Sequence, residues 1–205
     1  MKKLILLLGV LTIPSFAGVS ANVAFSSDYF WRGMTQSDGP AMSGGFDYES
    51  ESGFYAGLWG SNVNFNDGAG SELDYYAGYA FSLDEIGIDI GYVAFDYPEN
   101  KTGLDFDEWV LGLSYKDLGL TFTDDTDDSD AYTEISYAIG DIGFSYGDYK
   151  NYGENFTISY GFTCGSFDCS FLYTEFSGET NSSGAYLYGP DEDGLVFSIS
   201  ASLGG

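Results

Sequence analysis

Apolar and polar residues alternate one by one along most of this chain. In LVFSISASL, residues 195–203, the five odd positions are apolar and three of the four even positions are serine. The same period of two is present in residues 131–139 and 154–163. Successive side chains of a β-strand point to opposite faces, so each segment would present one apolar and one polar face. The alternation predicts an all-β chain and leaves no place for helices.

Turn residues divide the alternating stretches into about twelve predicted strands. Their ranges are 22–35, 40–50, 53–65, 72–82, 86–97, 105–115, 118–124, 131–139, 142–149, 154–163, 167–177 and 194–203. The connections alternate between tight ones, such as SLDEIG and YKDLG, and mostly longer polar ones, such as PENKTG and DDTDDSD. This asymmetry is typical of outer-membrane barrels, whose periplasmic turns are short and whose extracellular loops are long. We therefore expect an antiparallel transmembrane β-barrel with both chain ends on the short-turn side.

The N-terminal segment indicates export from the cytoplasm. MKKLILLLGVLTIPSFAG combines a lysine pair, an apolar run over residues 4–13 and small residues around Ala17, which is the order of a secretory signal peptide. The apolar run is too short to cross a bilayer as a helix, which takes about 20 residues. Cleavage after Ala17 or after Ala21 would fit the pattern. We expect residues 1–21 to be the signal peptide and residues 22–205 to form one domain.

A soluble periplasmic β-sandwich would show the same alternation, because it also buries one face of each strand. The composition favours the membrane barrel: 29 Gly, 18 Tyr and 17 Phe with only 4 Pro suit aromatic strands joined by tight turns. After the signal peptide no apolar run is long enough for a spanning helix, and a closed barrel is the other structure that crosses a membrane. The alternating connection lengths point the same way. We expect the bacterial outer membrane as the location.

Residues 20–65 resemble the start of the TorF-type porin family of Gram-negative bacteria. The matching elements include Ser27-Asp28-Tyr29, Arg32-Gly33, Thr35-Gln36, Pro40-Ala41, Gly45-Phe46-Asp47-Tyr48, Gly53-Phe54-Tyr55, Gly57, Trp59, Ser61 and Asn62. From about residue 72 onward the likeness is one of pattern and length. The resemblance implies an outer-membrane barrel with pore activity, in a family whose transported solutes are largely unassigned.

Charged residues within the strands are expected to face the lumen, because a charge facing lipid at mid-membrane costs about 2 to 4 kcal/mol. Applied strand by strand, this rule predicts the pore-lining residues Asp28, Arg32, Asp47, Asp74, Asp89, Glu108 and Glu134. The predicted outward residues are Val23, Phe25, Tyr29 and Trp31 in the first strand, and Phe46, Tyr48, Tyr75, Tyr79, Ile88, Ile90, Trp109, Leu111, Ile135 and Tyr137 in later strands.

Arg32 would then be the one base in an acidic interior, and two roles compete for it. In the structural role it forms an ion pair with a lumen carboxylate across the first hairpin, for which Asp47 is the nearest candidate. In the functional role it stands in a constriction and grips solute carboxylate or phosphate groups bidentately. Ion pairs are common in such lumens, which favours the structural role.

The residue types needed for catalysis are poorly represented. The chain has no histidine, which removes the usual general base and the commonest metal ligand. The acidic run DDTDDSD at residues 124–130 lacks the glycine and glutamate of an EF-hand loop. The excess of 32 acidic over 6 basic residues is unsuited to nucleic acid. We expect no enzyme activity, no cofactor and no metal site; the expected partners are outer-membrane lipid and small hydrophilic solutes or cations.

The two cysteines, Cys164 and Cys169, flank one tight connection. In an oxidising periplasm a disulfide across that hairpin is favoured over free thiols, and zinc would need more ligands than two cysteines. For the whole chain we expect a porin that allows passive diffusion of small hydrophilic solutes and prefers cations. The alternative is a closed barrel with a filled lumen, which would act as a structural or surface-interaction protein.

Overall fold

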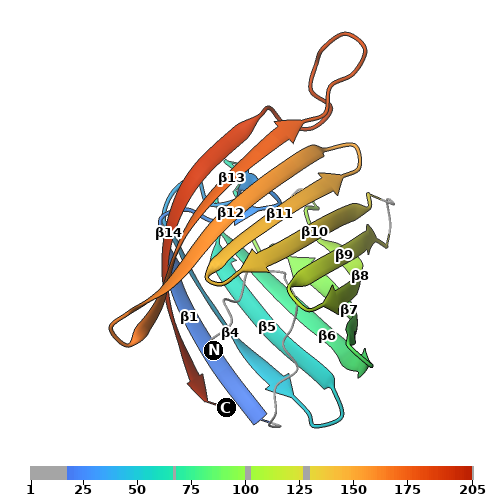
Figure 1. The fold of residues 1–205 in the computed structure, drawn as a ribbon. Helices are drawn as coiled ribbons and strands as arrows, with labels where there is room; N and C mark the ends of the chain where they lie inside the picture. Colours follow the sequence, from blue (N-terminus) through green and yellow to red (C-terminus); the bar gives the residue numbers. More distant parts are fainter. Residues whose placement is uncertain (1–17, 67, 100–102, 127–129, 205) are drawn as a thin grey trace.

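Twelve antiparallel strands close into a barrel in the computed structural model, which describes residues 18–66, 68–99, 103–126 and 130–204 (Figure 1). The wall strands are β1 (Gly18–Ser26), β4 (Ala41–Glu49), β5 (Phe54–Asn62), β6 (Ser71–Leu83), β7 (Ile86–Asp96), β8 (Phe106–Tyr115), β9 (Leu118–Asp125), β10 (Tyr132–Ile139), β11 (Ile142–Tyr149), β12 (Gly153–Cys164), β13 (Phe167–Gly178) and β14 (Glu192–Gly204). The predicted all-β barrel of about twelve strands is confirmed. The predicted signal-peptide residues 1–17 lie outside the described residues.

The first and last wall strands close the barrel. β1 pairs with β14 from Ser20 opposite Gly204 to Ser26 opposite Ser198, and on its other side with β4. Each of the remaining wall strands pairs with the wall strands that come before and after it in the sequence. Closure gives each strand a partner on both sides, so the wall has no open edge. Within the described parts of the chain, no helix has the length and apolar character needed to cross a membrane.

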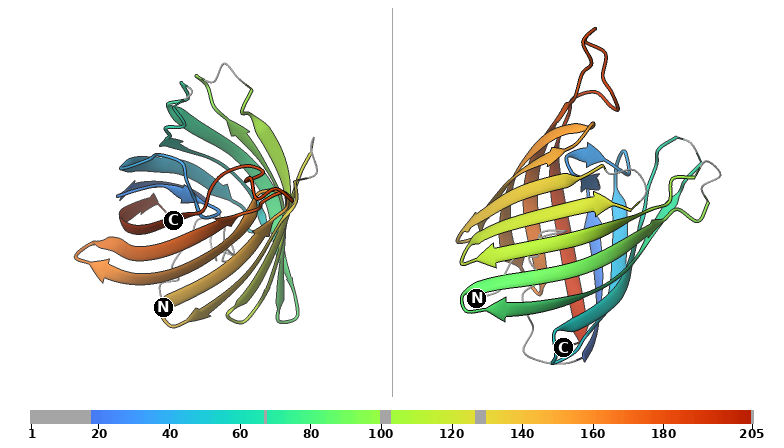
Figure 2. Two further views of the ribbon diagram at one scale, coloured as in Figure 1. Left: turned by 90° about the horizontal axis from the view of Figure 1, so that it is seen from above. Right: turned by 90° about the vertical axis from the view of Figure 1, so that its right-hand side faces the viewer.

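Connections differ between the two ends of the barrel. At one end, two-residue turns join β6 to β7, β8 to β9, β10 to β11 and β12 to β13. Each of these turns begins with a residue of positive φ, namely Asp84, Lys116, Gly140 and Gly165, a conformation used in tight hairpins. At the other end the connections are mostly longer, and the one between β13 and β14 projects beyond the rim (Figures 1 and 2). The predicted asymmetry of short turns and long loops is present.

The outer face of the barrel is apolar and exposed. Large side chains on this face include Val19, Val23, Phe25, Phe46, Tyr48, Leu58, Tyr75, Tyr79, Ile90, Trp109, Leu111, Ile135, Tyr137, Phe156, Tyr160, Phe171 and Leu195. Trp109 is 57% exposed and Leu195 is 69% exposed. The alternate residues of the same strands point inward and are largely polar, as with Ser198, Ser200 and Ser202 of β14. Each wall strand therefore has a mainly apolar outer face and a mainly polar inner face.

The prediction for the first strand was wrong beyond Ser26. Instead of continuing to residue 35, the chain leaves the wall, and residues 27–40 fold into the barrel as a segment that we call the inward hairpin. It contains two short strands, β2 (Phe30–Trp31) and β3 (Met34–Thr35), which form a separate sheet of their own. Tyr29 and Trp31, expected to face lipid, lie inside the barrel instead.

The carboxylate of Asp28 explains why the wall strand stops there. It accepts hydrogen bonds from the Tyr29 amide at 2.8 Å, the Thr35 hydroxyl at 2.9 Å and the Ser37 hydroxyl at 3.0 Å. A short side chain that bonds to nearby backbone and hydroxyl groups offers the chain an alternative to the sheet ladder. Asp28 is thus a turn-forming residue of the inward hairpin, not a residue of the barrel wall.

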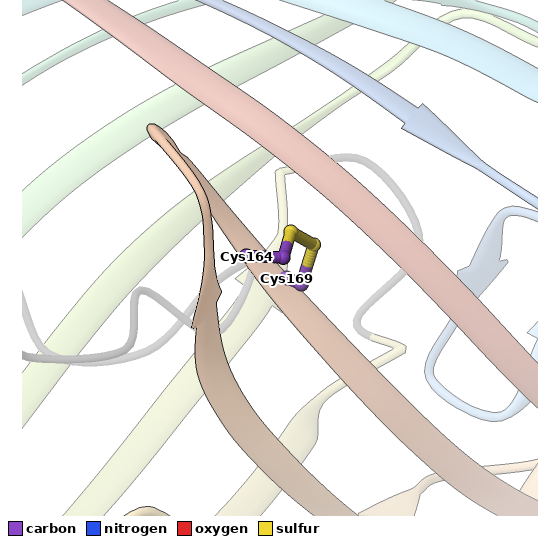
Figure 3. The surroundings of a disulfide bond; sticks show 2 residues. All are labelled: Cys164 and Cys169. Carbon is purple, nitrogen blue, oxygen red and sulfur yellow. A yellow bond between two sulfur atoms is a disulfide. The ribbon is translucent and has the colours of Figure 1, made fainter.

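Cys164 and Cys169 form a disulfide across the turn between β12 and β13 (Figure 3). Their Cα atoms are 5.9 Å apart, and Cys164 pairs with Phe167 while Cys169 pairs with Phe162 in the strand register. The bond therefore sits at the short-turn end, beside two aromatic residues.

Thiol labelling of the denatured, unreduced protein should find almost no free sulfhydryl. Because the bond closes a loop of only a few residues, Cys164→Ser/Cys169→Ser should lower the free energy of unfolding by about 2 kcal/mol or less. Labelling after reduction serves as the positive control. Quantitative labelling without reduction would contradict the disulfide.

Candidate functional site

The inward hairpin crosses the barrel from the wall at β1 to the opposite wall. β9 lies six strands from β1 in either direction around the ring, and the hairpin tip contacts β8, β9, β10 and β11. Figure 2 (right) draws the hairpin in blue near the rim that carries the longer loops. This segment therefore determines how much of the lumen is free at that level.

Arg32 at the tip forms an ion pair with Glu108 of β8. Its Nη1 donates to Oε1 at 2.8 Å and its Nη2 donates to Oε2 at 2.7 Å, which is bidentate geometry. Nη2 also donates to the hydroxyl of Thr123 on β9 at 2.8 Å. Arg32 is 8% exposed and Glu108 is 1% exposed. Such a pair is desolvated, so removing one partner would leave an uncompensated charge.

Three aromatic rings surround the same guanidinium. Its Cζ lies 4.1 Å from the ring centroid of Trp31, 4.2 Å from that of Tyr132 and 4.6 Å from that of Tyr149. Cations over aromatic faces within about 6 Å are attracted by the ring quadrupole, more strongly where water is excluded. Hydrogen bonds in the plane of the guanidinium and rings around it together account for its burial.

The backbone at the tip is in a costly conformation. Arg32 has φ of 49° and Gly33 has φ of 83°, so the two residues make a tight turn with positive φ at both central positions. A residue other than glycine at positive φ costs about 1 to 3 kcal/mol and persists only where its surroundings hold it. Gly33 is required in addition by space, because a Cβ there would lie 2.8 Å from Cβ of Asn155. The ion pair offsets the cost at Arg32.

The base of the hairpin is attached to the wall by side chains. The Tyr29 hydroxyl donates to Glu72 of β6 at 2.9 Å, and the Tyr29 ring packs edge-on against Trp59. Burial, together with the nearby Glu72 and Asp74 carboxylates, raises the pKa of Tyr29 well above its usual value, so its hydroxyl stays a donor. On the other side, the Thr35 amide donates to Glu192 at 2.9 Å.

Five of the predicted lumen carboxylates lie on inward-facing positions of the wall, namely Asp47, Asp74, Asp89, Glu108 and Glu134. Most accept a hydrogen bond from a tyrosine or amide of the lumen. Tyr55 donates to Asp89 at 2.8 Å, and Tyr132 donates to Glu134 at 3.0 Å. Oδ1 of Asp74 has no hydrogen-bond partner among the described residues.

The expected partner of Arg32 was wrong. Asp47 accepts hydrogen bonds from Asn22 at 3.1 Å and from Tyr76, whereas Arg32 pairs with Glu108. The difference follows from the hairpin: once residues 27–40 leave the wall, Arg32 is carried across the lumen and away from the neighbouring strand. Arg32 therefore does not stand free in the lumen as a solute-gripping group.

Several residues of this site were not selected from the sequence. Glu72 lies two positions from Asp74 in one strand, and Tyr132 lies two positions from Glu134 in another. Residues two apart in a strand face the same side, so the alternation could have placed both Glu72 and Tyr132 inside. Thr123 and Tyr149 carry no comparable signal, because a polar or aromatic side chain on one strand does not indicate which distant residue it will contact. Within the described parts of the chain, no group of three or more acidic or cysteine residues is arranged to hold a metal ion.

A family model described as "Bacterial protein of unknown function (Gcw_chp)" matches residues 14–126 of this chain. Among solved structures, the chain is similar to OccAB2 of Acinetobacter baumannii, with 13% identity, a TM-score of 0.38 and coverage of 89% of this chain and 59% of that one. For OccAB4 of the same organism, the identity is 11% and the TM-score is 0.37, with coverage of 88% of this chain and 57% of that one. The chain thus spans less than two thirds of these structures. No curated protein matches it. The TorF-type assignment stays a prediction.

A double-mutant cycle should measure the coupling between Arg32 and Glu108. Arg32→Met and Glu108→Gln should each lower the free energy of unfolding in lipid by about 3 to 5 kcal/mol, because each leaves a buried group without its partner. The double variant should lose much less than the sum of the two.

Lys116→Gln is the matched control, because this exposed cation lies in a turn over the ring of Tyr115, and it should change stability by no more than about 0.5 kcal/mol. Additive losses in the Arg32 and Glu108 variants, or losses as small as that of the control, would contradict the coupling.

Proposed function

The chain belongs to the Gcw_chp family of bacterial proteins of unknown function, and we propose that it is an outer-membrane channel for small hydrophilic solutes, narrowed by the inward hairpin. The observation that carries the proposal is the division of the wall into an exposed apolar outer face and a polar, acidic inner face. An apolar surface that encircles a barrel suits lipid contact, and a polar interior suits water and solutes.

The exposed residues of the outer face support membrane insertion. Soluble monomers rarely expose contiguous apolar patches larger than a few hundred Å². Here Val23, Leu58, Trp109, Ile135 and Leu195 come from different strands around the ring and are all exposed. A soluble sandwich would bury such residues between its sheets. We assign the longer loops to the extracellular side and the short turns to the periplasm, the usual arrangement in bacterial barrels.

The start of β1 favours one of the two cleavage positions. β1 begins at Gly18, and Gly18, Val19 and Ser20 already pair with Glu49, Tyr48 and Asp47. Cleavage after Ala21 would remove these ladder positions, whereas cleavage after Ala17 would leave the strand whole. We therefore propose Ala17 as the last residue of the signal peptide.

The charge of the lumen supports a preference for cations. Glu108 compensates Arg32, so the positive charge predicted in the pore is neutralised by its partner. Asp47, Asp74, Asp89 and Glu134 face the same interior. A lumen lined with carboxylates attracts cations and repels anions. Passage by diffusion requires no catalysis, so the proposal includes no enzyme activity.

A second candidate function is a barrel with a filled lumen that has a structural or surface-interaction role. The hairpin itself favours this candidate, because it spans the lumen and packs Met34 with Tyr132, Tyr149 and Phe176 in one buried cluster. Both candidates predict the same outer face. They differ in conductance, which a planar-bilayer recording measures.

Spin labels should distinguish the two faces of the wall in lipid vesicles. At Ile135 and Phe156 we expect strong broadening by oxygen, which concentrates in the bilayer. At Ser136 and Ser200, on inward positions of the wall, we expect weaker broadening by oxygen, because labels there would not contact lipid. Stronger oxygen broadening at the inward pair than at the outward pair would contradict the assignment of the faces.

Reversal potentials across a salt gradient should show cation preference in the wild type. Asp89→Asn should lower the cation-to-anion permeability ratio about twofold at about 0.1 M salt. A unit charge roughly 8 Å from an ion contributes about 0.5 kcal/mol in water, with opposite sign for cations and anions, and screening at this salt concentration roughly halves both contributions. The effect should shrink between 0.1 M and 1 M salt as the Debye length falls from about 10 Å to about 3 Å.

Asp84→Asn is the control for this measurement, since Asp84 is an exposed turn residue and asparagine also tolerates its positive φ. An anion-selective wild type would contradict the lumen assignment. Insertion into the bilayer without any conductance would contradict the channel function and support the barrel with a filled lumen.

A further inference from the structure

Apart from the ring of Trp31, the groups that contact the guanidinium of Arg32 belong to the opposite wall. Glu108, Thr123, Tyr132 and Tyr149 come from four consecutive strands, β8 to β11, and none of them belongs to the inward hairpin. They supply a bidentate carboxylate, a hydroxyl acceptor and two aromatic rings to one group. We call these four residues the guanidinium site. The wall provides the receptor, and the hairpin provides the ligand.

We propose that the guanidinium site binds the guanidinium group of a small organic cation, and that Arg32 occupies it as a tethered ligand which such a cation can displace. The binding site does not depend on whether the lumen conducts. Its consequence for passage does rest on the proposed channel function: a solute that displaces Arg32 would also loosen the segment that narrows the lumen.

The chemistry of the site distinguishes guanidinium from ammonium. A planar guanidinium presents two parallel N–H groups that match the two oxygens of a carboxylate, and its flat faces stack on aromatic rings. An ammonium is a compact charge that cannot make both contacts in one plane. Glu108 receives both parallel hydrogen bonds, and rings lie near the same Cζ atom. The site is therefore specific for the shape of the group as well as for its charge.

The hairpin can be withdrawn without opening the wall. β2 and β3 pair only with each other, over two residue pairs, and no ladder of the barrel passes through them. Side-chain attachments of the hairpin include those of Tyr29 to Glu72 and of the Thr35 amide to Glu192. At the tip, Nε of Arg32 and Nε1 of Trp31 have no hydrogen-bond partner among the described residues. The tip is held by the polar contacts of the Arg32 guanidinium and by apolar packing of Trp31 and Met34. A free guanidinium ligand would replace the polar part of this attachment.

Arg32→Gly provides the direct test, because glycine removes the tethered ligand and is the residue best suited to φ of 49°. The refolded barrel would be heated in lipid vesicles with increasing methylguanidinium chloride or, in parallel, methylammonium chloride. Methylguanidinium should raise the unfolding temperature of this variant saturably, by about 3 to 6 °C at ten times its dissociation constant. Methylammonium should have little effect, and Arg32→Gly/Glu108→Gln should respond to neither cation.

A second measurement uses the intact hairpin, so that the proposal is tested even if Arg32→Gly does not fold. With Trp59→Phe and Trp109→Phe, Trp31 is the single tryptophan. Methylguanidinium should shift its emission to longer wavelength as it leaves the aromatic cluster, at concentrations above those that saturate Arg32→Gly, because a tethered ligand has a high effective concentration. Methylammonium should not.

The proposal is overturned if methylguanidinium stabilises Arg32→Gly no more than methylammonium does, or stabilises the double variant equally. It is also overturned if Trp31 emission stays unchanged by methylguanidinium. Neither result depends on conductance, so failure of the binding site is distinguishable from failure of the channel function.

Discussion

Closure of the strand ladder between β1 and β14 is the constraint on which the other features depend. A closed ring has only an inside and an outside, so each wall residue must face one or the other. Every wall strand carries exposed apolar residues on the outside, and charged residues of the wall's interior positions face the enclosed lumen. Within the ring, Asn22 donates to Asp47, Tyr55 donates to Asp89 and Tyr132 donates to Glu134. The acidic lumen and the lipid-facing surface are two results of one closure.

The inward hairpin adds the guanidinium of Arg32 to this acidic interior. Because Arg32 meets Glu108 and three aromatic rings, its charge is neutralised at the far wall. Burial of an ion pair is costly unless geometry and hydrogen bonding are good, and replacing such a pair by apolar residues often stabilises a protein. The left-handed backbone at Arg32 adds to that cost. The proposed recognition of guanidinium groups would give both of these costly features a function.

The sequence could predict the inward carboxylates of the site, but it could not predict the partner of Arg32. The inward carboxylates follow from strand parity, since a one-residue change of face would put a charge in lipid. The partner of Arg32 does not follow from parity, because it depends on where residues 27–40 leave the wall. The alternation of apolar and polar residues continues through that segment, so it predicted Tyr29 and Trp31 to be outward-facing residues of the wall. The hydrogen bonds of Asp28 that end the strand involve residues up to nine positions further along.

The sequence by itself determined the class of fold, the approximate strand boundaries and the face of most wall residues, because these depend on local alternation and turn residues. It also brought Cys164 and Cys169 to one hairpin. The tertiary structure alone decided that the first loop folds inward, that Arg32 pairs with a residue 76 positions away, and that four consecutive strands supply its receptor. The physical reason is that a period of two specifies which way a side chain points, whereas a contact across the lumen depends on the curvature of the closed ring.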